Sequence, residues 1–197
     1  MPLKRTKSEL RVQRDTLKRF QRYLPTLQLK KQQLQSELRQ VELQRAELEA
    51  ELKKIQRERE SWVALFAEPL PLADWLSVKK LEIGTQHIAG VDVPVIAQFE
   101  LEENCPERFE KPVWVDDGLK ALREEVTFGV RLEILRQQES LIEAELCTTS
   151  QRVNLFEKVK IPEAKENIRI IRIALGDEQV AGVASGKLAK KKNEVAA

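Results

Sequence analysis

The chain has 197 residues, of which 34% are charged and only 5% aromatic. This composition, rich in Leu, Glu, Gln, Lys and Arg, favours long helices over a compact mixed fold. The formal net charge of +2 excludes a strong overall field directed at nucleic acid or a membrane surface. The charge is unevenly distributed, because both ends of the chain are basic and residues 42–110 are acidic.

Residues 1–66 carry the pattern of one long coiled-coil helix. From Leu10 onward, apolar residues recur at alternating steps of three and four, and most positions between them are Gln, Glu, Lys or Arg. A stripe this narrow is typical of a coiled-coil seam. A few positions of this heptad frame hold polar residues, and Arg45 is one of them. The predicted seam residues are Leu17, Leu24, Leu27, Leu34, Leu38, Val41, Leu48, Leu52 and Ile55.

Pro25 lies inside this pattern, in the string RYLPTLQLKK. Proline in a helix interior removes one backbone hydrogen bond and costs about 3 kcal/mol. The heptad frame nevertheless passes through Pro25 without losing phase. We therefore expect a kinked helix here, with a helix–turn–helix as the alternative.

Residues 67–117 change character and predict a small insert. Prolines lie near both of its ends, and between them the β-rich strings LSVKKLEI and VPVIAQFELEE are joined by GTQHIAG. This pattern predicts a β-hairpin or a small irregular β element, with loops on each side. A hairpin of this size is marginal alone and must pack on another element. We expect Trp62, Trp75 and Trp114 to pack the insert onto the helices; a binding hot spot is the alternative. Asp116 and Asp117 read as the cap and first-turn charges of the next helix.

Residues 118–197 return to a helical pattern that steps by fours and threes. The predicted seam contains Leu135, Ile142, Leu146 and Val153, with Glu139 as a polar exception. Pro162 then interrupts the pattern and predicts a second kink. Beyond it, the chain is first apolar and then rich in small residues before the basic end.

Two long seams need partners, and the simplest partner for each is the other. The predicted fold is mainly α. It is a long antiparallel two-helix coiled-coil hairpin of N- and C-terminal helices, with a small β-hairpin-containing insert at the bend. This arrangement brings both basic ends of the chain to one tip.

No set of residues in the sequence points to chemistry. Cys105 and Cys147 are isolated thiols without metal-ligand spacing, and His87 lies alone in a presumed turn. Neither a glycine-rich phosphate loop nor a carboxylate pair with a base is present. We expect a non-catalytic chain without cofactor or metal. The absence of a signal-peptide pattern and of about 18 consecutive apolar residues predicts a soluble chain in a reducing compartment, without membrane insertion.

Three strings, in this order along the chain, resemble a known family. The first is TKSELRVQRDTLKRFQRYLPTLQLKKQQLQ, the second is HIAGVDVPV, and the third is RVNLFEKVKIPEAKENIRIIRIALGDEQVAGVASGKLAKKK. Over nearly the whole chain they are similar to the D subunit of V-type/A-type rotary ATPases, the central rotor stalk. In the second string His87 stands where the family usually has Asn. The positions that match the carboxy-terminal signature are Arg152, Asn154, Glu157, Pro162, Ile168, Ile171 and Leu175.

The resemblance implies a cytoplasmic rotor subunit, peripheral to the membrane and present as a monomer within a hetero-oligomeric complex. Its paired termini would enter the cavity of the catalytic and non-catalytic head subunits. The middle of the rod would bind the small F-type stalk subunit, and the far end would meet a socket subunit on the membrane ring. Ile168, Ile171, Leu175, Val180 and Val183 would supply apolar surface either to the partner helix or to the head. The residues expected in the head cavity are Lys4, Arg5, Lys7, Leu10, Ile168, Ile171, Leu175, Val180, Val183, Lys187 and Lys190.

Two other functions fit parts of the pattern. A prefoldin-like chaperone also uses a coiled-coil hairpin, but the rod here is long and its tip is strongly basic. A nucleic-acid-binding hairpin could use the basic tip, but no stacking aromatics lie among the lysines. We therefore expect no nucleic-acid partner.

Overall fold

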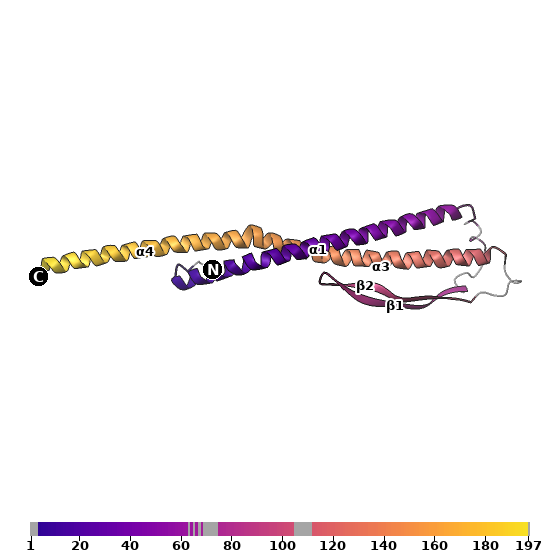
Figure 1. Cartoon of the computed structure of the whole chain (residues 1–197), viewed down its shortest axis with the longest axis horizontal. Helices are drawn as coiled ribbons and strands as arrows, with labels where there is room; N and C mark the ends of the chain where they lie inside the picture. Colours follow the sequence, from indigo (N-terminus) through magenta and orange to yellow (C-terminus); the bar gives the residue numbers. More distant parts are fainter. Residues whose placement is uncertain are drawn as a thin grey trace. The chain divides into compact units, whose positions relative to one another are not determined.

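The computed structural model describes residues 4–62, 64, 66, 68, 75–104 and 112–196, with side chains up to residue 191. Its elements are helix α1 (Lys7–Arg59), strands β1 (Leu76–Ile88) and β2 (Val91–Glu103), helix α3 (Val115–Asn154), the π-helix η2 (Leu155–Lys160) and helix α4 (Ile161–Ala196) (Figure 1). The predicted fold class, mainly helical with a small β-hairpin, is confirmed. Cys105 lies outside the described residues.

The chain divides into two compact units. One comprises Met1–Lys31 with Thr148–Ala197, and the other comprises Gln32–Cys147. Helix α1 runs through Pro25 without a break, so the helix–turn–helix alternative does not hold. The described positions of both predicted seam frames are buried or half-buried, including those on either side of Pro25.

In the unit Gln32–Cys147, α1 and α3 run antiparallel. Polar contacts join Arg45 to Glu139, Gln56 to Glu125 and Arg59 to Glu124, so residue numbers rise along one helix as they fall along the other. The fully buried core residues Leu34 and Ile142 lie in this unit. The partly buried residues Leu38, Leu135 and Leu146 pack around them.

The β-hairpin shares this core. Val93 of β2 is fully buried in one cluster with Leu34 and Ile142, and Gln138 of α3 donates a hydrogen bond of 2.6 Å to the carbonyl of Pro94. These contacts supply the packing that an isolated hairpin lacks.

The strands of the hairpin are longer than the sequence pattern predicts, although their register shifts between Val78 and Lys80 and between Glu82 and Ile83. The strands extend through most of GTQHIAG and leave a turn of only Ala89 and Gly90, which have φ values of 49° and 84°. Positive φ at both central residues is the signature of a type I′ turn, whose twist matches that of the flanking strands. The loop expected between the strands is therefore almost entirely strand.

An aromatic cluster lies where α1 ends and α3 begins. Phe66 packs against Trp62 and Trp114, with ring centroids 5.7 and 5.4 Å apart. Gly118 allows this close approach, because a Cβ at that position would lie 3.0 Å from the Trp114 ring. Asp116 and Asp117 lie within the first turn of α3, which starts slightly earlier than the sequence pattern indicates.

In the unit that contains both termini, α1 packs along η2 and α4. Phe20 contacts Phe156 with ring centroids 5.1 Å apart, and Val153, Ile161 and Ala164 are buried. The π-helix lies immediately before Pro162, which has no N–H to donate and whose ring crowds the carbonyl four residues earlier. The wider π-helical turn accommodates the missing N–H and the proline ring. In this turn the N–H of Ile161 donates to the carbonyl of Phe156, five residues earlier.

Candidate partner-binding surfaces

The C-terminal part of α4 is helical although none of its described side chains is buried. Every residue from 177 to 191 is exposed, and the helix continues to Ala196. Figure 1 shows this segment extending beyond the start of α1 within the terminal unit. Helical continuity also holds at Gly176, which lies inside α4. We call residues 177–191 the exposed α4 segment.

Apolar side chains are exposed on this segment. Val180, Val183 and Leu188 are 70%, 60% and 64% exposed, respectively. A single helix in water gains little from its own hydrogen bonds, and most helices depend on burying an apolar face. The exposed α4 segment therefore lacks the buried apolar face on which most helices depend.

The N-terminal tip is basic and capped. Thr6 precedes α1, and its hydroxyl accepts a hydrogen bond of 3.3 Å from the backbone N–H of Glu9, as an N-cap residue does. Lys4, Arg5 and Lys7 are exposed, whereas Leu10 is half-buried. Lys187 and Lys190 of α4 are also exposed.

The residues predicted to line the head cavity fall into two groups. Ile168 is 7% exposed and Ile171 is fully buried, so both pack inside the terminal unit. This burial favours the first of the two roles expected for them, packing against the partner helix. Leu175 is half-buried, and Val180 and Val183 are exposed.

Ion pairs on α4 are superficial. Arg169 donates hydrogen bonds of 2.9 and 2.7 Å to Glu166. These bonds lower the pKa of the Glu166 carboxyl and raise the pKa of the Arg169 guanidinium. Because both side chains are exposed, the pair adds little to stability.

Groups that could support chemistry are few among the described residues. His87 and Asp92 lie on the hairpin, with Nδ1 and a carboxylate oxygen 2.7 Å apart and both side chains about 70% exposed. Carboxylate oxygens of Glu42, Glu139 and Glu143 lie within 4.8 Å of one another, but the Nε of Arg45 lies 3.0 Å from Glu139 and supplies a counter-charge. No helix in the described part of the chain has an apolar stretch long enough to cross a bilayer.

Comparison with known proteins identifies the family. The family model for the ATP synthase D subunit matches residues 9–191. The chain is 44% identical to the V-type ATP synthase D subunit of Borreliella burgdorferi, over 95% of this chain and 93% of the relative. It is 37% identical to the protein of the same name from Chlamydia felis, over 96% and 93%, and 33% identical to that from Chlamydia pneumoniae, over 98% and 94%. The chain therefore belongs to the ATP synthase D-subunit family.

Proposed function

We propose that this chain is the central shaft of a V/A-type rotary ATPase, a non-catalytic subunit that transmits torque between the ATP-hydrolysing head and the membrane ring. The observation that carries the proposal is the exposed α4 segment. It stays helical for several turns although its side chains are exposed, and Val180 and Val183 present apolar surface. Such a helix is suited to insertion into a surrounding collar of other subunits.

The proposed orientation combines what the family resemblance implies with the distribution of charge and burial. Lys4, Arg5 and Lys7 would enter the head cavity together with Lys187 and Lys190. Ion pairs in water are worth only about 0–1 kcal/mol each, so they can break and re-form as the shaft turns. The small apolar side chains of α4 would give contact without deep anchoring. The middle of the rod would bind the small F-type stalk subunit, and the opposite end would meet the socket subunit.

Family membership favours this function over the two alternatives. Neither a prefoldin-like chaperone nor a nucleic-acid-binding hairpin corresponds to the name shared by the relatives. We place the chain at the cytoplasmic face of the membrane, as a peripheral part of the complex.

The test is site-specific photo-cross-linking in the intact complex from the native cell. A photoreactive residue at Val183 should cross-link to head subunits, whereas one at Val78, an exposed position on β1, should not. Mass spectrometry of the adducts identifies the partners. Cross-links from Val183 to heterogeneous unfolded proteins or to nucleic acid would contradict the proposal, as would the absence of any head subunit among its adducts.

A further inference from the structure

Each seam contains a charged residue near its middle, and α1 carries two more charged seam residues, Lys31 and Arg59. Arg45 occupies a seam position of α1 and Glu139 occupies a seam position of α3. In each helix, the seam positions one heptad before and one heptad after the charge are leucines. These flanking residues are Leu38 and Leu52 in α1, and Leu132 and Leu146 in α3.

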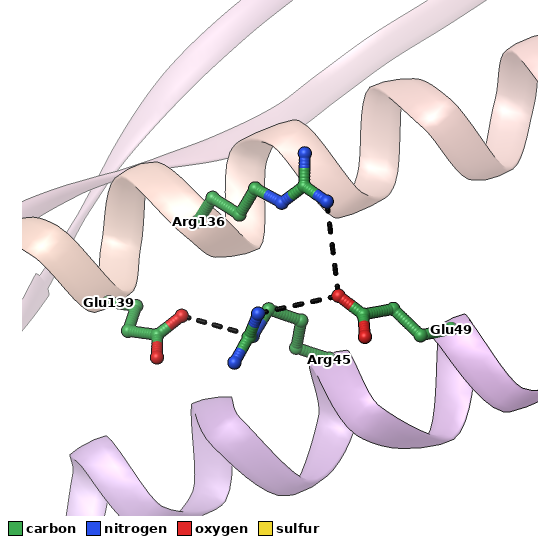
Figure 2. A network of polar contacts seen from close by, with 4 residues as sticks. All are labelled: Arg45, Glu49, Arg136 and Glu139. Atoms are coloured by element: carbon green, nitrogen blue, oxygen red, sulfur yellow. Dashed lines mark hydrogen bonds and ion pairs between the residues drawn. The ribbon is translucent and has the colours of Figure 1, made fainter.

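The structure brings Arg45 and Glu139 together. Arg45 Nε lies 3.0 Å from a carboxylate oxygen of Glu139, and the two side chains are only 33% and 18% exposed (Figure 2). Arg45 also donates a hydrogen bond of 3.3 Å to Glu49, which lies 3.9 Å from Arg136 on α3. Figure 2 shows Arg45 reaching between the two carboxylates. The four residues form an alternating chain of charges across the two helices.

Suppose that α1 slides along α3 by one heptad, about 10 Å. All of the remaining seam residues would still face the seam of the other helix. The charges would not keep partners. Arg45 would face Leu132 or Leu146, and Glu139 would face Leu38 or Leu52. Each slip would thus leave two half-buried charges facing leucine. The free energy of these unpaired charges would be higher than that of the same charges in the observed ion pair.

A slip of two heptads in one direction would pair both charges again, Arg45 with Glu125 and Glu139 with Lys31. That shift would move α1 by about 21 Å along α3. The hairpin opposes it, because Val93 lies in one core cluster with Leu34 of α1 and Ile142 of α3. The ion pair and the hairpin therefore exclude different wrong alignments.

We propose that Arg45 and Glu139 are positioning residues that select the axial register of α1 against α3. The leucines supply the attraction between the helices, and they would supply nearly as much of it one heptad away. The ion pair lowers the free energy of one alignment relative to the alignments shifted by one heptad. Single polar residues in coiled-coil seams have the same effect. This inference does not depend on the proposed function. In a shaft, the register determines which residues of the two helices face a surrounding subunit at the same level.

Disulfide cross-linking of the full chain reports the register directly, in a background with both native cysteines replaced by serine. Leu38→Cys with Leu146→Cys reports the observed alignment. Leu38→Cys with Val153→Cys reports a slip of one heptad, and Leu52→Cys with Glu125→Cys reports the opposite slip. The unaltered charge network should give the first cross-link at least tenfold more than either of the others.

Replacing the pair with Arg45→Leu and Glu139→Leu should keep the helix content and allow at least one slipped cross-link to form to a similar extent. Glutamine at both positions gives the same test if the leucine variant aggregates. The control is Arg136→Leu alone, which removes the more exposed end of the network, leaves the contact between Arg45 and Glu139 in place and should keep the single alignment.

Inverting all four charges restores opposite signs at every contact of the network. This variant should again give mainly the cross-link of the observed alignment. If the native pair only stabilised the fold and did not select the register, this recovery of a single alignment would not be expected. Two results would overturn the proposal. One is a leucine-pair variant that still forms only the Leu38–Leu146 cross-link, and the other is a four-charge inversion that forms all three.

Discussion

At the scale of single residues, Leu34 connects the helices to the hairpin. Its side chain is fully buried in α1, in one cluster with Ile142 of α3 and Val93 of β2. The heptad pattern predicts that Leu34 is a seam residue, but any leucine of the frame carries the same signal. The partner Val93 lies in another element far along the chain, so the pattern gives no indication that this leucine packs against the hairpin as well as against α3.

Substituting Leu34 by alanine should lower the free energy of unfolding by about 2–5 kcal/mol, because it leaves a cavity among three elements. Leu43→Ala is the matched control, since Leu43 lies on the same helix and is 62% exposed. It should change the free energy of unfolding by less than about 0.5 kcal/mol. Urea denaturation followed by circular dichroism measures both. Equal effects of the two substitutions would show that the core is not centred at Leu34.

At the scale of elements, regular periodicity was predictable and local exceptions were not. The seams of α1 and α3 extend over many turns, so a few polar residues such as Arg45 do not obscure their phase. The π-helix before Pro162 has no apolar period of its own, because it arises from backbone hydrogen bonding beside a residue without an N–H. The contact between Arg45 and Glu139 depends on how two separate frames align, which neither frame specifies alone.

The turn of the hairpin provides a test of backbone conformation. Gly90 has a φ of 84°, in the left-handed region that an alanine side chain disfavours by about 1–2 kcal/mol. Gly90→Ala should therefore speed hydrogen exchange of the β1 and β2 amides, by roughly fivefold or more. Gly129→Ala is the control of opposite sign. Gly129 lies within α3, and a Cβ added there would meet no atom within 4 Å, so alanine should stabilise the helix by about 0.5–1 kcal/mol. Unchanged or slower hairpin exchange in Gly90→Ala would contradict the assigned turn.

At the scale of the whole molecule, α4 contains both residues that are buried in the fold and residues that are exposed. The sequence pattern assigns Ile168, Ile171, Val180 and Val183 to one apolar surface, since all lie in the same helical stretch. The structure divides them, because the first two are buried and the last two are exposed. Where α4 loses its packing depends on where α1 begins, so the division could not be read from α4 alone.

Deleting residues 177–197 should separate folding from assembly. The exposed α4 segment has no buried side chain, so the free energy of unfolding should fall by less than about 0.5 kcal/mol. ATP-driven ion transport by the complex containing this variant should fall several-fold or be lost, because the proposed head contact is missing. The control deletion, residues 168–197, also removes the buried Ile168 and Ile171 and should lower stability by several kcal/mol. Urea unfolding of the free chains and ion transport by the reconstituted complex measure the two effects independently. Undiminished transport after the shorter deletion would mean that torque reaches the head through other residues, whereas a large loss of stability would mean that residues 177–197 help to fold the chain itself.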